Sequence, residues 1–153
     1  MLVKGILDSR SVLLDDESPS KKRVLERAAQ LLSDGDSELS ESIFERLLER
    51  ERLGSTGLAG GVALPHARMP GVTRTRGAFI RLAEPVDFDS LDDKPVDLVF
   101  ALLVPEQATD EHLQLLAQLA GLFNDADMCA RLRQASREQA HALLTGQSAH
   151  HAA

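Results

Sequence analysis

Apolar residues recur every three to four positions in two early segments of the chain, and this spacing predicts two helices. The first covers residues 21–32, KKRVLERAAQLL, and Ser20 stands directly before it as a suitable N-cap. The second covers residues 41–53, with Ser40 as its N-cap and Gly54 as the residue that ends it. Each helix presents one apolar face.

Apolar runs without helical spacing predict strands at 62–64, 77–82 and 96–104, and the short run 11–14 is a further candidate. Residues 96–104, VDLVFALLV, are nearly all apolar. Such a run is typical of a strand that is covered on both faces, as at the centre of an α/β sheet.

Helical spacing returns after the last strand candidate. A helix is predicted for residues 110–123, with Thr109 as its N-cap and two acidic residues in its first turn. Shorter helices are predicted for 128–135 and 136–144, and Gly146 ends the second of them.

This order of elements predicts a single α/β domain. The domain is expected to cover residues 1–146 of the 153, and residues 147–153 are expected to form a disordered tail. The hydrophobic content of 43% suffices for a core in a chain of this length, and there is no internal repeat or low-complexity linker.

Two features indicate a cytoplasmic protein. Cys129 is the only cysteine, so the chain has no internal disulfide, which suits a reducing compartment. The longest apolar run, residues 98–104, is far shorter than a membrane span, and Lys4 and Asp8 interrupt the N-terminal apolar residues too early for a signal peptide. We expect no membrane insertion.

The charge balance argues against one class of partner. The chain has 17 Lys and Arg against 24 Asp and Glu, a formal net charge of −7. Binding to nucleic acid depends on a basic face, so no nucleic-acid partner is expected.

The stretch GGVALPHARMPG places His66 after Pro65, at the end of a glycine-rich loop. Proline restricts the backbone, so the histidine leaves the preceding strand in a defined direction. Neutral imidazole is a nucleophile near pH 7 and carries phosphoryl or acyl groups. The alternative is a histidine that is hydrogen-bonded and chemically inert.

His112 falls in the first turn of the helix predicted at 110–123. Backbone N–H groups and the positive end of the helix dipole favour an anion there. The alternative is that His112 takes the place of the acidic partner in a capping box. Together, His66 and His112 suggest phosphate chemistry.

Several motifs are absent. There is no H-E-x-x-H or C-x-x-C, so no metal site is predicted. There is no P-loop, G-x-G-x-x-G or G-x-S-x-G either, which argues against nucleotide binding and a hydrolase nucleophile elbow. No cofactor is expected, and a metal-dependent hydrolase that uses the two histidines is a remote alternative.

Three segments in order carry a family resemblance: RERLGSTGLAGGVALPHAR, PVDFDSLDDKPVDLVFALLVP and EHLQLLAQLA. They resemble the enzyme IIA domain of the fructose/mannitol class of the bacterial phosphotransferase system, and within it the stand-alone nitrogen-related branch, IIA-Ntr. The resemblance runs from Ser20 to Gly146. It implies a single α/β domain whose mixed, mostly parallel β-sheet has helices on both sides.

The resemblance also implies a function. His66 would accept a phosphoryl group from an HPr-like phosphohistidine protein, and His112 would support the phosphate. Arg50 and Thr56 match residues that line the site. Apart from the resemblance, the place of Arg68 just beyond His66 suggests that it steers the incoming anion, and the alternative is a solvated arginine. The phosphorylation state would be the regulatory output, read by regulatory or transport proteins that the sequence does not identify.

Two alternatives stay open within this family. One is a IIA subunit of a fructose/mannitol-type sugar permease. The other is a binding module that no longer carries phosphate. The second is motivated by Gly60, where family members commonly have Asn or Glu, so a polar group beside the site would be lost.

Overall fold

A computed structural model describes residues 2–107 and 109–146 of the chain. The tail expected at 147–153 lies outside the described residues. Within the described ranges, no helix combines the length and apolar character needed to cross a membrane.

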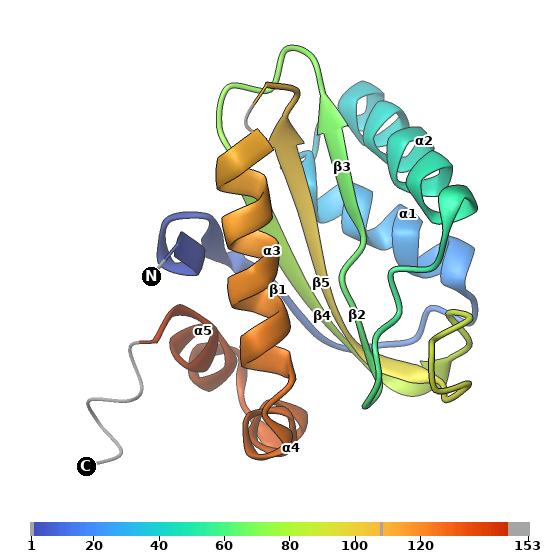
Figure 1. Cartoon of the computed structure of the whole chain (residues 1–153), viewed down its shortest axis with the longest axis vertical. Coiled ribbons are helices and arrows are strands. Elements are labelled where there is room, and N and C mark those ends of the chain that lie inside the picture. Colours follow the sequence, from blue (N-terminus) through green and yellow to red (C-terminus); the bar gives the residue numbers. More distant parts are fainter. Residues whose placement is uncertain (1, 108, 147–153) are drawn as a thin grey trace.

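A five-stranded sheet forms the centre of the fold (Figure 1). Strand β5 lies between β4, to which it is antiparallel, and the short strands β2 and β3, which follow one another along its other side and run parallel to it. Strand β1 pairs in parallel with β4. The mixed, mostly parallel sheet is therefore confirmed. The strands are β1 (Leu7–Asp16), β2 (Val62–Ala63), β3 (His66–Met69), β4 (Arg76–Val86) and β5 (Val96–Pro105).

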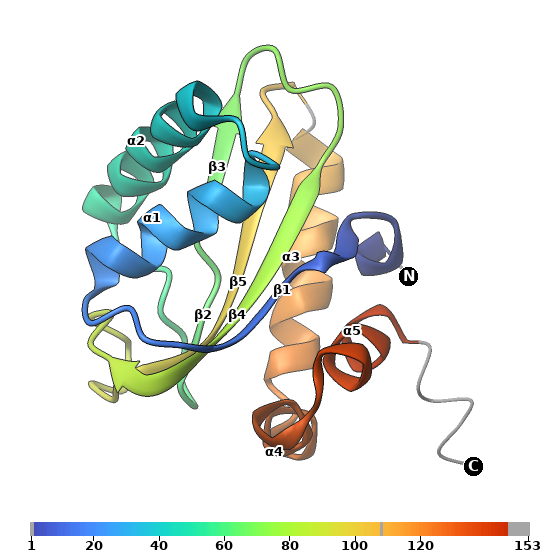
Figure 2. The same cartoon turned by 180° about the vertical axis from the view of Figure 1, so that it is seen from behind.

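Helices cover both faces of the sheet, as predicted. Helices α1 (Lys21–Leu32) and α2 (Ser37–Leu53) lie on one face (Figure 2). Helices α3 (Thr109–Phe123), α4 (Ala126–Gln134) and α5 (Arg137–Thr145) lie on the other, with the 3-10 turn η1 (Leu2–Gly5) (Figure 1).

Strand β5 separates the core into two halves. Its side chains point to alternate faces because successive residues of a strand alternate. From Leu98 to Val104, every second residue packs under α1 and α2 and the intervening residues pack under α3 to α5, so this part of the strand is apolar throughout. The first set is Val99, Ala101 and Leu103, and the second is Leu98, Phe100, Leu102 and Val104.

Two of the predicted helix ends are confirmed. The hydroxyl of Ser20 accepts a hydrogen bond from the Arg23 N–H at 3.3 Å and caps α1. Gly146 ends α5 in the left-handed conformation, with φ of 82°. Both capping residues act within one turn of their helix, so they can be recognised from the sequence.

The predicted starts of α2 and α3 are wrong. Helix α2 begins at Ser37 because Asp36 accepts the Leu39 N–H at 3.1 Å, after a turn at Gly35 with φ of +88°. Ser40 therefore lies inside the helix. Helix α3 begins at Thr109, so Thr109 is the first helical residue and not the cap.

Further boundaries also differ. Helix α4 begins two residues earlier than predicted, because the Asp125 carboxylate caps it, and Ser136 caps α5 instead of lying within it. Strand β1 is longer than the run 11–14, because its pairing with β4 begins at Leu7, opposite Gly77, and ends at Asp16, opposite Leu82. Strand β4 is likewise longer than 77–82.

Candidate functional site

His66 is the first residue of β3 and not the end of a loop. Pro65 has no backbone N–H, so pairing with β5 stops after Ala63 and resumes at His66, opposite Leu102. The Pro65 carbonyl still accepts the Leu102 N–H at 2.9 Å. His66 is thus anchored directly to the central strand.

The short strand β3 sends its side chains to both faces of the sheet. Ala67 and Met69 belong to the core half beneath α1 and α2. Because strand residues alternate, His66 and Arg68 point to the opposite face, where α3 lies. This alternation explains how a histidine on a strand reaches a histidine on a helix.

The rings of His66 and His112 meet edge to face. Their centroids are 5.2 Å apart and their planes are inclined by 67°. His112, in the first turn of α3, is 5% exposed, and His66 is partly exposed. The structure therefore brings together the two histidines that the sequence singled out.

The imidazole of His66 is held by the backbone two residues before it. Its Nδ1 lies 2.9 Å from the Leu64 carbonyl oxygen. A carbonyl oxygen only accepts, so Nδ1 carries the proton. The lone pair is then on Nε2.

His112 has the complementary arrangement. The Arg68 Nε–H donates to His112 Nδ1 at 3.2 Å, so Nδ1 is unprotonated and Nε2 carries the hydrogen. Within the described residues, the buried His112 Nε2 has no hydrogen-bond partner. A buried donor without a partner is costly, and a bound oxyanion would satisfy it.

Both histidines are neutral at pH 7. Burial lowers the pKa of His66, and the nearby Arg50 and Arg68 lower it too, against the opposing bond to Leu64. Burial, then the adjoining His66 ring and the positive charges of Arg68 and Arg50, lower the pKa of His112 to about 4. A neutral His66 keeps the Nε2 lone pair that a nucleophile needs.

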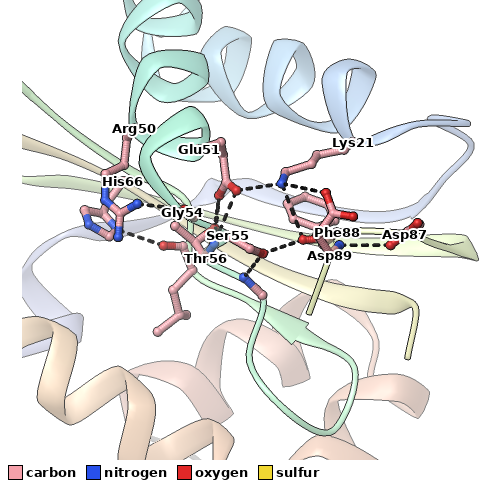
Figure 3. A network of polar contacts seen from close by, with 12 residues as sticks. Lys21, Arg50, Glu51, Gly54, Ser55, Thr56, His66, Asp87, Phe88 and Asp89 are labelled. Atoms are coloured by element: carbon pink, nitrogen blue, oxygen red, sulfur yellow. Dashed lines mark hydrogen bonds and ion pairs between the residues drawn. The ribbon is translucent and has the colours of Figure 1, made fainter. Parts of the chain in front are cut away.

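Arg50 contributes a second guanidinium near the end of α2 (Figure 3). Its Nη1–H donates to the Gly54 carbonyl at 2.8 Å. That bond uses one of the five N–H donors of a guanidinium. Two arginines and the start of α3 thus surround two neutral rings, a charge arrangement suited to an oxyanion.

The described residues around the two histidines form no cluster of metal ligands. Across residues 2–107 and 109–146, no three His, Cys, Asp or Glu side chains are grouped so that they could hold an ion. The arrangement that is present is a neutral nucleophile beside hydrogen-bond donors and cations.

Residues 5–146 match the sequence profile of the family described as "Phosphoenolpyruvate-dependent sugar phosphotransferase system, EIIA 2". The chain belongs to this family. It is a phosphocarrier component of a phosphotransferase system, and the resemblance seen in its motifs is confirmed.

Named relatives lie in both branches of the EIIA family. The nitrogen regulatory protein of Pseudomonas aeruginosa is 48% identical over 139 residues, which are 90% of each chain. The crystal structure of the nitrogen regulatory protein IIA-Ntr from Neisseria meningitidis has a TM-score of 0.90 and 49% identity, covering 95% of this chain and all of that one. The fructose-specific EIIA component of Haloferax volcanii is 34% identical over 129 residues, 84% of each chain.

Thr56 in this EIIA domain contacts a carboxylate and not the histidine rings. It is 6% exposed, and both its N–H and its hydroxyl donate to Glu51 (Figure 3). Its own carbonyl accepts the Leu64 N–H at 3.1 Å. Thr56 thus reaches His66 only through the backbone of Leu64.

Gly60 bonds through its backbone to two side chains from other segments. Its N–H donates to Asp92 at 3.1 Å, and its carbonyl accepts from Arg133 at 2.8 Å. The Gly61 carbonyl accepts the N–H groups at the beginning of β5, whereas His66 pairs with Leu102. The residues of β5 beside Gly61 and His66, Leu98 and Leu102, are four positions apart, which corresponds to about 13 Å along the strand.

Glu51 is the residue that sequence reasoning missed. It is 7% exposed and follows the buried residues Ile43 and Leu47 at intervals of four. A glutamate on the apolar face of a helix is rarely buried without a partner, and this spacing was the available signal.

Proposed function

We propose that this EIIA protein is a phosphocarrier of the nitrogen-related phosphotransferase system. It accepts a phosphoryl group on Nε2 of His66 from an HPr-like phosphohistidine protein, and its phosphorylation state is the regulatory output. The observation that carries the proposal is the pairing of an Nε2 lone pair on His66 with a buried, unpartnered Nε2–H on His112.

The transfer step is balanced without movement of a proton. His66 Nε2 attacks the phosphorus, a new N–P bond forms, and the N–P bond of the donor breaks. The electron pair of the broken bond returns to the donor imidazole, which leaves neutral. The positive charge moves to the phosphorylated ring of His66, where the Leu64 carbonyl stabilises the Nδ1–H.

The phosphoryl oxygens carry negative charge through the transfer, and three side chains surround them. His112 offers its Nε2–H, and Arg50 and Arg68 offer cationic charge. Prearranged donors of this kind stabilise charge that develops in the transition state. His112 and Arg68 act as a pair, because the Arg68 bond sets which nitrogen of His112 donates.

Membership of a sugar permease is the second candidate, supported by the 34% identity to a fructose-specific EIIA component. The regulatory role has the stronger support, since the relatives named as nitrogen regulatory proteins reach 48% identity. The third candidate is a binding module without phosphotransfer, motivated by Gly60, and it predicts that wild type gains no phosphoryl group.

Intact-protein mass spectrometry tests the proposal. The protein is incubated with phosphoenolpyruvate, enzyme I and an HPr-type carrier. Wild type is expected to gain one acid-labile phosphoryl group and His66→Ala none. His141→Ala is the control, because His141 bonds the Leu7 carbonyl at 2.9 Å on the α5 side of the fold. Absence of a gain in folded wild type, with an active donor chain, would refute the proposal.

A further inference from the structure

A buried carboxylate lies behind the histidine pair. The Glu51 side chain is 3% exposed, in the last turn of α2. It forms an ion pair with Lys21 Nζ at 2.8 Å. It also accepts hydrogen bonds from the Thr56 N–H, at 3.2 Å to each oxygen, and from the Thr56 hydroxyl. Both carboxylate oxygens are therefore fully engaged.

The contacts of Glu51 continue to His66 through the backbone. Glu51 holds Thr56, the Thr56 carbonyl accepts the Leu64 N–H at 3.1 Å, and the Leu64 carbonyl accepts the His66 Nδ1–H at 2.9 Å. Figure 3 shows this path from Lys21 to the ring of His66. Every step is a hydrogen bond or ion pair between groups that are at least partly buried.

This chain of contacts affects the His66 ring through the Leu64 carbonyl, which accepts the Nδ1–H. The Leu64 N–H and C=O face the segment of Thr56, on the side of the strand away from β5, so the sheet alone does not hold that carbonyl. Its position depends on the Leu64 N–H on one side and on the Pro65 carbonyl, bonded to Leu102, on the other. Only the first of these anchors leads to a side chain.

We infer that Glu51 is a positioning residue for phosphoryl transfer: through Thr56 and Leu64 it holds the proton of His66 on Nδ1 and aims Nε2 at the donor. The inference rests on the proposed role of His66. The second tautomer of neutral imidazole carries its proton on Nε2 and has no lone pair there. If the Leu64 carbonyl shifts away from Nδ1, the His66 ring therefore loses both its fixed orientation and the lone pair on Nε2.

A glutamate suits this position better than a glutamine. The carboxylate faces donors only: the Lys21 ammonium and the N–H and O–H of Thr56. A carboxylate accepts at both oxygens, whereas a glutamine amide has one oxygen and an NH2 group. In Glu51→Gln the NH2 group would face one of these donors, and that contact would be lost.

The test compares two buried carboxylates. Asp16 is 7% exposed and pairs with Arg27 at 3.2 Å, at the end of edge strand β1, so Asp16→Asn is the matched control. Nitrogen-15 NMR of the His66 ring at about pH 8 measures the tautomer ratio of the neutral imidazole and needs no phosphoryl donor. Glu51→Gln is expected to lower the ratio of Nδ1–H to Nε2–H by about tenfold. Asp16→Asn is expected to leave it at the wild-type value.

Transfer kinetics form the second arm. In Glu51→Gln the rate at saturating phospho-carrier is expected to fall by about tenfold, with KM for the carrier unchanged, because only the nucleophile is misplaced. If Glu51→Gln does not fold, Thr56→Val removes one donor of the path and is expected to lower the rate by about threefold.

The outcomes separate the inference from the proposed function. A His66 tautomer ratio in Glu51→Gln that equals the ratio in Asp16→Asn would overturn the inference, whatever the kinetics. A wild type that shows the Nδ1–H ring but takes up no phosphoryl group would refute the proposed function and leave the positioning of the ring by Glu51 supported.

Discussion

Arg68 on β3 and His112 on α3 are joined by a hydrogen bond of 3.2 Å, from the arginine Nε–H to the histidine Nδ1. The two residues are 44 positions apart in the chain. Their contact determines that the buried Nε2 of His112 is a donor, because a ring nitrogen that accepts carries no hydrogen.

Replacement of Arg68 by Met releases the Nδ1 of His112. The proton of His112 is then free to occupy either nitrogen, and one cation near the phosphoryl oxygens is lost. We expect the rate of phosphoryl transfer to His66 to fall by about tenfold, measured by rapid-quench assays with a phosphorylated HPr-type carrier. Arg131→Met changes the net charge equally on exposed α4, where Arg131 only approaches Asp127 at 3.9 Å, and is expected to retain the wild-type rate. Equal rates in both variants would contradict the prediction.

Replacement of His112 by Ala removes the donor itself. Loss of one donor to a developing oxyanion costs about 100-fold in rate in other enzymes, and we expect a loss of about that size here. His66 is expected to remain the only residue that is phosphorylated, as shown by mass spectrometry of the slowly formed product. A His112→Ala rate within about threefold of wild type would exclude a role for this ring in transfer.

The free energy of unfolding is expected to depend on pH through His112. The pKa of His112 is lowered from 6.5 to about 4 in the folded protein, so the unfolded state binds the proton first. Stability is then fully present above pH 6.5 and falls as the pH drops toward 4. We expect a loss of ~2 kcal/mol across this window in urea titrations. His112→Gln should flatten the curve, and an unchanged slope would show that other groups cause it.

Gly57→Ala is expected to destabilise the fold. An added Cβ at Gly57 would overlap the Ser90 hydroxyl and lie 3.2 Å from the Ser90 Cα, which is backbone and cannot move aside. Overpacking of this kind costs about 1–3 kcal/mol, measurable as a lower urea midpoint. The matched control is Gly121→Ala in α3, where an added Cβ has no neighbour within 4 Å. That variant should gain ~0.5–1 kcal/mol from helix propensity.

The parts of the fold that sequence reasoning predicted well depend on local signals. The Ser20 cap and the Gly146 stop act within one turn of their helices, and the run 96–104 reveals by its composition that both of its faces are covered. The start of α2 was misjudged because Asp36 and Ser40 are both plausible caps, and the turn at Gly35 that leads out of α1 selects the first.

Strand β3 escaped prediction for a related reason. Its four residues, HARM, lie between two prolines and alternate polar with apolar. His66 is partly covered because α3 lies over it, whereas Arg68 stays exposed, and a polar residue in sequence carries no mark of such cover. Glu51 was missed in the same way: its partners, Lys21 and Thr56, come from two other segments.

The amino-acid sequence by itself determined the α/β class, most helices and strands and the EIIA family, and it singled out His66 and His112 as candidate site residues. These features depend on periodicity, on capping residues and on short motifs, all of which act between neighbours in the chain. Only the tertiary structure decided which ring nitrogen of each histidine carries the proton and that Thr56 hydrogen-bonds to Glu51. Hydrogen bonds to buried groups depend on which segments the fold brings within about 3 Å, and residues such as Arg68 and His112 meet only after the sheet and its helices have packed.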